Sequence, residues 1–287
     1  MPAGVLFDAP GPRALRRYKI TAVVTVVGII MTLALVTWKL WTEDQLTAEI
    51  WEPFVTPAII EFLLEALLET LRAAVLAIAG AMVFGVIFGV GKLSDHSAMR
   101  WPCWGVVEFF RAVPLLLLII FIWAVQGYPR DTIFPLVLGL ILYNGSVLAE
   151  VVRAGINAVP KGQSEASYAI GMRKNQVMRI VLLPQAVKIM LPAIISQCIV
   201  ALKDTSLGYA ILAPGLTLAG RRIWGEFDNR LATAIVLAAI YILLNLILSW
   251  LAEYLQRRMG APKMEIVGGI VKAQPDAGAS GAGATAA

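Results

Sequence analysis

Residues 73–91 read AAVLAIAGAMVFGVIFGVG, nineteen consecutive residues without a charged side chain. A hydrocarbon core about 30 Å thick needs about 20 helical residues, so this run is long enough to cross a bilayer as one helix. Every fourth position carries a small side chain: Ala73, Ala77, Ala81, Gly85 and Gly89. Residues at that spacing share one helical face, and faces of small residues let membrane helices approach closely. The run predicts a membrane-spanning helix that packs against a neighbour through this face.

Five more apolar runs lie before and after this one. Four of them contain no Asp, Glu, Lys or Arg: residues 20–38, 112–129, 132–149 and 231–252. The last covers residues 189–211. Its uncharged part, residues 189–202, is too short to span alone, and Lys203 and Asp204 interrupt the apolar pattern before it resumes. Of the 287 residues, 59% are hydrophobic and 15% charged, whereas soluble domains average about 25% charged. We therefore predict an all-α integral membrane protein with six transmembrane helices.

This composition excludes several classes of protein. An ordinary soluble enzyme, a disordered chain and a disulfide-rich secreted domain are all inconsistent with so much apolar sequence and only two cysteines. The net charge of +5 does not indicate a nucleic-acid partner, because the basic residues form short clusters between apolar runs. A single histidine, His96, precludes a multi-histidine metal site. We expect neither a catalytic residue nor a metal ligand in this chain.

Lys and Arg residues are distributed unevenly between the two sides of the predicted spans. With both termini cytoplasmic, only Arg130, Arg221, Arg222 and Arg230 lie outside. The sixteen inner residues are Arg13, Arg16, Arg17, Lys19, Lys92, Arg100, Arg153, Lys161, Arg173, Lys174, Arg179, Lys188, Arg257, Arg258, Lys263 and Lys272. Positive charge marks cytoplasmic loops. We therefore place residues 1–19 in a cytoplasmic tail and residues 259–287 in a disordered cytoplasmic tail.

The first apolar run has an alternative interpretation as a signal peptide, because basic residues precede it. Its uncharged core is longer than the usual roughly 7 to 15 residues, and no small-x-small cleavage site follows it. The sequence favours an uncleaved transmembrane helix over residues 20–41.

Three pairs of ionisable residues lie at or near the predicted hydrocarbon: Glu108 with Arg111, Glu150 with Arg153, and Lys203 with Asp204. A charge at membrane depth costs at least about 2.5 kcal/mol, so such residues indicate function by default. The first two pairs also fit local ion pairs near the cytoplasmic boundary, because their members are three residues apart. Lys203 and Asp204 point about 100° apart on a helix, which disfavours a simple ion pair between them.

The longest polar stretch of the core is AGINAVPKGQSEASYAIGMRKNQVMRIVLLPQAVK at residues 154–188. Pro160 suits the start of a short helix, and Gly171 suits its left-handed end. A second short helix from about Asn175 would present Val177, Ile180 and Val181 on one side before Pro184 breaks it. Two such helices joined at a glycine form a compact knob, which either lies in the membrane interface or docks on a cytoplasmic partner.

The residues of this stretch resemble a known family. Glu165, Ala166 and Ser167, then Gly171 four positions later, and Val181-x-Leu183-Pro184 after nine more residues, are similar to the EAA loop of bacterial ABC importer permeases, whose pattern is EAA-x3-G-x9-I-x-LP. Ser167 and Val181 are the two conservative departures. The flanks FFRAVPLLL (109–117), AEVVRAGINAVPKGQ (149–163) and the KDTSL segment (203–207) resemble the branch that serves polar amino acids. The extra first span, with VLFDAPGPR and TAEIWEPF around it, is similar to actinobacterial glutamate permeases.

This resemblance implies a permease core of five helices over residues 61–258, with a coupling loop at residues 155–186 and one extra N-terminal helix. It implies a plasma-membrane subunit of an ATP-driven importer for glutamate or a related polar amino acid. The implied partners are a dimeric ATPase subunit, a second permease subunit and an extracellular amino-acid-binding protein. ATP and Mg would bind the ATPase, with no cofactor in this chain. The implied coupling residues are Glu165, Ala166, Ser167, Gly171, Leu183 and Pro184.

An anionic amino acid that crosses a low-dielectric path needs cationic or dipolar groups along it. The candidate path residues are Arg111, Asn144, Gln197, Lys203, Asp204, Thr205 and Ser206. Our hypothesis is that Lys203 supplies positive potential on this path, and the alternative is that it pairs with an acidic group for structural reasons.

Two other functions stay open from the residues alone. An ion-coupled secondary transporter would use Lys203, Asp204 or Glu150 as coupling groups, although no inverted repeat is evident. A membrane scaffold would use the knob only for docking. The chain itself lacks a P-loop, since Gly91-Lys92-Leu93 has neither the upstream glycine nor the following Ser or Thr.

Overall fold

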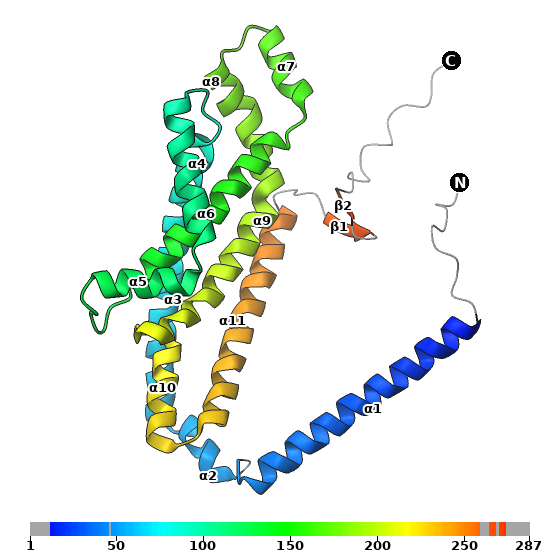
Figure 1. Cartoon of the computed structure of the whole chain (residues 1–287), viewed down its shortest axis with the longest axis vertical. Helices are drawn as coiled ribbons and strands as arrows, with labels where there is room; N and C mark the ends of the chain where they lie inside the picture. Colours follow the sequence, from blue (N-terminus) through cyan, green and yellow to red (C-terminus); the bar gives the residue numbers. More distant parts are fainter. Residues whose placement is uncertain (1–11, 46, 259–263, 268–269, 274–287) are drawn as a thin grey trace.

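The structure is a computed structural model that describes residues 12–45, 47–258, 264–267 and 270–273. Figure 1 shows an elongated bundle of helices and one helix, α1, that leaves the bundle. The first elements are α1 (Pro12–Thr42), α2 (Ala48–Trp51) and the 3-10 turn η1 (Glu52–Val55). The bundle contains α3 (Pro57–Gly91), α4 (Ser97–Ala112), α5 (Leu115–Val125), α6 (Phe134–Asn157), α7 (Lys161–Ala169), α8 (Lys174–Gln176), the π-helical turn η2 (Val177–Leu182), α9 (Leu183–Asp204), the 3-10 turn η3 (Thr205–Ile211), α10 (Leu216–Phe227) and α11 (Arg230–Arg258). The predicted helical membrane fold is confirmed.

The small-residue face of α3 packs against α6 as predicted. All five of its members are buried: Ala73, Ala77, Ala81, Gly85 and Gly89. A Cβ atom added at Gly85 would lie 2.7 Å from Leu148 Cβ, and one added at Gly89 would lie 2.8 Å from the carbonyl oxygen of Ala149. The two backbones therefore approach so closely that only small residues fit between them.

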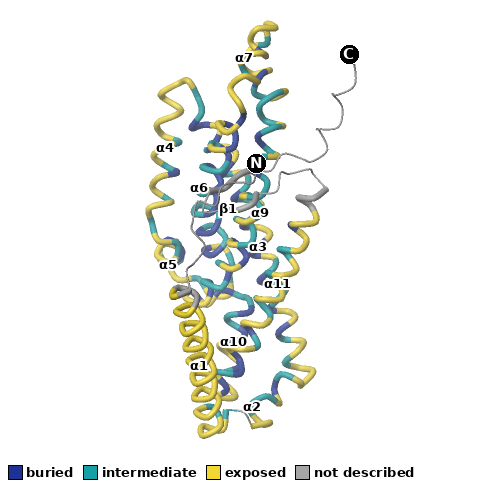
Figure 2. The backbone as a smooth tube through the Cα atoms, turned by 90° about the vertical axis from the view of Figure 1, so that its right-hand side faces the viewer, coloured by how far each residue is buried: buried dark blue, intermediate teal, exposed yellow. Residues whose placement is uncertain are grey.

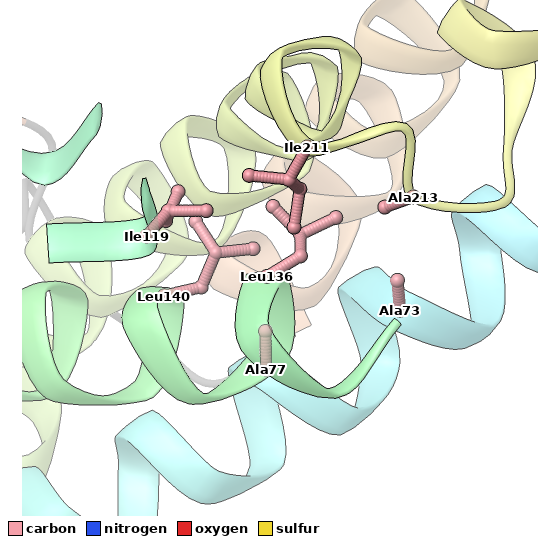
Figure 3. Close-up of a cluster of buried hydrophobic side chains, with 7 residues drawn as sticks. All are labelled: Ala73, Ala77, Ile119, Leu136, Leu140, Ile211 and Ala213. Carbon is pink, nitrogen blue, oxygen red and sulfur yellow. The ribbon is translucent and has the colours of Figure 1, made fainter. Parts of the chain in front are cut away.

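A buried apolar cluster joins this helix pair to the rest of the bundle. Figure 3 shows its members, which come from α3, α5, α6, η3 and the segment that follows η3: Ala73, Ala77, Ile119, Leu136, Leu140, Ile211 and Ala213. Burial of apolar surface stabilises such a cluster only modestly in lipid, so close packing carries most of its energy.

Apart from half-buried Leu40, the residues of α1 whose burial is described are exposed, and Figure 2 colours the helix almost entirely yellow. It begins at Pro12, eight residues before the predicted span, and its apolar part covers Arg16–Thr42. A helix of this length with no buried residue in its apolar part is long enough to cross a bilayer and be surrounded by lipid. The predicted extra N-terminal helix is therefore present.

The predicted third span, residues 112–129, is not one straight helix. Helix α4 ends at Ala112, α5 begins at Leu115, and the two are bent by 101°. Pro114 explains the break, because proline has no N–H to donate and disfavours helical backbone at the preceding residue. Val113 is accordingly extended, with φ −78° and ψ 127°. Five described helical segments are long and apolar enough to cross a bilayer, and the bent pair α4–α5 makes six if it counts as one span.

The predicted fifth span, residues 189–211, also differs from the structure. Helix α9 begins six residues earlier, at Leu183, and its regular part ends at Asp204, where η3 continues the run to Ile211. Leu212 then has φ 56°, and this left-handed residue ends the run before α10.

The predicted disordered tail, residues 259–287, contains two short antiparallel strands, β1 (Met264–Val267) and β2 (Ile270–Ala273). The structure differs from the prediction at these eight residues, because the prediction rested on the Gly and Ala content of the tail and overlooked the stretch MEIVGGIVKA, in which two mostly apolar runs flank a Gly-Gly pair that favours a hairpin. The rest of that tail and residues 1–11 lie outside the part that the structure describes.

Candidate functional site

The first helix that lies wholly within the coupling loop is α7, which follows Pro160 as the sequence predicts. Gly171 has φ +84° and ends the helix in a Schellman arrangement: its N–H donates to the Tyr168 carbonyl at 2.9 Å, and the Met172 N–H donates to the Ser167 carbonyl at 3.2 Å. No atom lies within 4 Å of a Cβ built on Gly171. The position therefore requires glycine for its backbone conformation and not for lack of space.

Ser167 replaces the alanine of the EAA pattern without leaving a polar group unpaired. Its side chain is buried, and its hydroxyl donates to the Gln163 carbonyl at 2.6 Å. The Gln163 side chain in turn accepts a hydrogen bond from Gln185 Nε2 of α9 at 3.3 Å. The first bond lies within α7, and the second links α7 to the start of α9.

The second half of the loop is not the separate short helix that the sequence predicts. Helix α8, η2 and α9 form one helical run from Lys174 to Asp204, and Pro184 lies in the first turn of α9. The wider π-helical turn just before Pro184 accommodates a residue that cannot donate to the preceding turn. Val177 and Ile180, which were predicted to share one apolar face, point to different surroundings in this altered turn: Val177 is fully buried, whereas Ile180 is 65% exposed.

The outer surface of the knob carries both charge and apolar side chains. Glu165, Ala166 and Pro184 are exposed, and Leu183 is half-buried. Tyr168, Ile170 and Ile180 are exposed as well. The sequence analysis missed the first two of these, although apolar residues inside a polar loop were the signal that could have found them. An exposed surface that combines an acidic side chain with several apolar ones is suited to the docking of a partner protein.

The loop between α3 and α4 contacts the coupling loop. The Lys174 ammonium donates a hydrogen bond to the Asp95 carboxylate, which belongs to the loop between α3 and α4. This bond holds the pKa of the Asp95 carboxyl below its usual range. Both side chains are more than half exposed, so the pair positions the two loops and adds little to stability.

A polar cluster inside the bundle contains three of the candidate path residues. Gln197 of α9 donates to the Asn144 side chain of α6, and Asn144 Nδ2 donates to Asp204 Oδ2 at 3.4 Å. Asn144 is only 1% exposed. Thr205 is buried beside them and donates to the Leu202 carbonyl at 2.7 Å, and Ser206 is half-buried. The cluster places a carboxylate and two amides between α6 and α9.

Lys203 and Arg111 lie apart from this cluster. Lys203 is exposed and makes no ion pair among the described residues, so the pairing with Asp204 that the sequence left open is absent from them. Arg111 belongs to a separate group of charges. Its guanidinium lies 3.6 Å from Glu108 and 3.9 Å from Glu150. The structure therefore divides the seven candidates into a polar cluster, an isolated cation and a charge group.

Glu150 is the centre of that charge group. Lys92, at the end of α3, donates to Glu150 Oε1, and Arg153 Nε donates to Oε2 at 2.9 Å. The Lys92 side chain is only 4% exposed. Sequence reasoning predicted the local pairs of Glu108 with Arg111 and of Glu150 with Arg153 but missed Lys92, which it treated as a loop residue. A contact between residues 58 positions apart gave no local signal.

Comparison with known proteins identifies the family. Residues 81–261 match the family described as binding-protein-dependent transport system inner membrane component. The chain belongs to this family. It is 42% identical over 199 residues to the glutamate transport system permease protein GluD of Corynebacterium glutamicum, an alignment that covers 66% of this chain and 72% of that protein. It is 30% identical to the glutamate/aspartate import permease protein GltK of Escherichia coli, with coverage of 59% and 80%.

Solved structures give the same result for the fold. An amino acid ABC transporter crystallised with histidines has 29% identity and a TM-score of 0.65, covering 69% of this chain and 94% of that one. The MetNI methionine ABC transporter has 20% identity and a TM-score of 0.63, a likeness in fold alone. The chain is therefore a multi-pass permease subunit of an ABC importer, as the coupling-loop residues indicated.

Proposed function

We propose that this chain is a permease subunit that imports glutamate or a related polar amino acid across the bacterial plasma membrane. The names of its relatives support an acidic or amide-bearing substrate. The polar cluster supports a passage for a polar molecule, because Asn144 and Gln197 offer amides and Asp204 a carboxylate that can meet an amino group. Lys203, Thr205 and Ser206 extend this path, with Lys203 as its isolated cation.

The observation that carries the proposal is the knob and its attachment to two long helices. Helix α6 leads directly into α7, and α9 continues without interruption from the other side of the knob. A partner that moves the exposed surface around Glu165 therefore moves α6 and α9 together, and these two helices hold the polar cluster between them. Glu165, Ala166, Ser167, Gly171, Leu183 and Pro184 are the proposed coupling residues.

The proposed assembly contains a dimer of a separate ATPase, which binds ATP and Mg and covers the knob. A second permease subunit pairs with this chain, and an extracellular amino-acid-binding protein delivers the substrate on the opposite side. Both termini are cytoplasmic, in accord with the positive residues around the knob. In this arrangement the chain moves substrate and performs no catalysis itself.

Uptake by the complete complex tests the proposal. The four components are reconstituted in liposomes, and uptake of radiolabelled glutamate is measured with and without ATP. We expect uptake that needs ATP and the binding protein, together with ATPase activity that glutamate and the binding protein stimulate. The Asp204 carboxylate, which has no cationic partner among the described residues, favours ion-coupled transport as the second candidate. Uptake driven by a proton or sodium gradient without ATP would establish that candidate and overturn the first.

A further inference from the structure

A cavity of about 390 Å³ opens between α4 and α6, apart from the polar cluster. It is lined by Arg111, Tyr143, Val147, Glu150, Val151 and Ala154. Four of these side chains, at positions 143, 147, 150 and 154, recur along one face of α6. Arg111 reaches the cavity from the end of α4, next to the bend at Pro114. The cavity thus combines apolar side chains with the Tyr143 phenol, the Glu150 carboxylate and one guanidinium, that of Arg111, whose contacts can change when α4 moves.

The charges around this cavity do not balance. Three cations, Lys92, Arg111 and Arg153, face two carboxylates, Glu108 and Glu150, which leaves one positive charge in excess. Both oxygens of Glu150 already accept hydrogen bonds, one from Lys92 and one from Arg153. Arg111 therefore has only two longer contacts, at 3.6 Å and 3.9 Å, and neither is a hydrogen bond. Arg111 is thus the one of the three cations that makes no hydrogen bond to either carboxylate, so its N–H donors can bind a ligand.

An arginine in this state is suited to a planar oxyanion. Guanidinium groups bind carboxylates through two parallel hydrogen bonds, and these bonds are stronger away from bulk water. The apolar side chains of Val147, Val151 and Ala154 form the rest of the cavity lining and offer no competing hydrogen-bond partner. The side chain of Arg111 is 40% exposed, so a ligand can still reach it. A small anion is the ligand that such a guanidinium can bind without displacing a hydrogen bond.

The position of the cavity along α6 indicates which anion it receives. Glu150 follows Asn144 by six residues, about 9 Å along the helix axis, toward the end that carries the knob. Val147 and Val151 of the cavity follow Asn144 by three and seven residues, so they lie on nearly the same side of α6 as that member of the polar cluster. A substrate that leaves the polar cluster toward the knob would meet Arg111 next.

We propose that this cavity is a second substrate station on the cytoplasmic side of the path, where Arg111 binds the carboxylate of the amino acid before release. The inference rests on the proposed import function and adds a residue and a ligand group to it. Lys92 and Arg153 hold Glu150 so that it does not neutralise Arg111. Motion of the bent pair α4–α5 shifts Arg111 toward Glu150 or away from it and so binds or releases the substrate.

Equilibrium binding of glutamate to the purified, nucleotide-free complex tests the role of Arg111. Arg111→Gln should weaken glutamate binding by about tenfold to a hundredfold, since it removes a charge-assisted hydrogen bond. Arg111→Lys should retain part of the affinity. The matched control is Arg100→Gln, because Arg100 is an exposed arginine of the same helix, α4, that does not line the cavity and makes no ion pair with Glu150 among the described residues. Equal affinity in wild type and Arg111→Gln would overturn the proposal, as would an equal loss in both Gln variants.

A second measurement leaves Arg111 unchanged. Ala154→Cys places a thiol in the cavity, and Ala158→Cys places one a turn beyond it on exposed surface, with Cys103 and Cys198 replaced by Ser. Glutamate should slow thiol modification at position 154 at least about threefold and leave position 158 unchanged, because bound ligand blocks access. The measurement is made in phosphatidylcholine nanodiscs and repeated with phosphatidylglycerol. Protection that requires the anionic lipid and not glutamate would assign the cavity to a lipid phosphate and overturn the proposal.

The two proposals fail separately. If the wild-type complex imports no glutamate with ATP, the import function fails. If it imports glutamate but position 154 is not protected, only the second station is wrong.

Discussion

At the scale of single residues, Gly171 is where the coupling loop depends most on one backbone angle. A side chain in left-handed conformation costs about 1 to 2 kcal/mol. Gly171→Leu should therefore misdirect α7 relative to α8 while the membrane helices stay folded. We expect the amount of protein in the membrane to stay near wild type and ATP-driven uptake to fall at least about tenfold.

Gly162→Leu is the matched control for this change. Gly162 lies in the same loop and also has open space around its Cβ position, but its φ is not positive. It should transport at a rate within about twofold of wild type, since leucine is a good helix former. Normal uptake by Gly171→Leu would show that the turn does not transmit the ATPase motion.

Lys203 is the second residue whose role a single substitution can decide. Because it makes no ion pair with Asp204 among the described residues, Lys203→Met should leave assembly intact and lower glutamate uptake at least about tenfold through lost positive potential. Additional replacement of Asp204 by Asn should not restore uptake. Lys188→Met, an exposed lysine on the same helix, should behave as wild type. Loss of assembly that Asp204→Asn rescues would instead favour a structural pair.

At the scale of elements, the α3–α6 contact predicts a strong dependence on one glycine. Gly85→Leu would place atoms against both the Leu148 side chain and the α6 backbone, so it should destabilise the fold by about 1 to 3 kcal/mol. Gly105→Leu in α4 is the control, since nothing lies within 4 Å of its Cβ position. The thermal midpoint of the purified protein should fall for the first variant only. An unchanged midpoint for Gly85→Leu would contradict the observed close packing.

The elements also show which features the sequence could predict. The small face of α3 and the turn at Gly171 were predicted correctly, because helical period and backbone preference are local properties. The 101° bend and the continuous run through Pro184 were not, because proline permits several outcomes and tertiary packing selects one. Lys92 was missed for a related reason: its carboxylate partner lies on another helix.

At the scale of the whole molecule, the proposed topology can be checked in intact cells. Glu49→Cys and Asp228→Cys lie on exposed surface at the end of the bundle opposite the knob, and Lys161→Cys lies on the knob itself. A membrane-impermeant thiol reagent should label the first two from outside and reach position 161 only after permeabilisation, because positive loops stay in the cytoplasm. External labelling at position 161 would reverse the orientation.

The helical run from Lys174 to Asp204 has a mechanical consequence. At 1.5 Å per residue, residues 174–204 extend over about 46 Å, from the surface loops to the centre of the bundle. Such a run acts as a lever: a rotation of about 5° around its midpoint carries each end about 2 Å, in opposite directions. Displacement of that size is enough to break the 3.4 Å contact between Asn144 and Asp204. ATP hydrolysis on the partner ATPase would then act on the polar cluster through a small change in the angle of one helix.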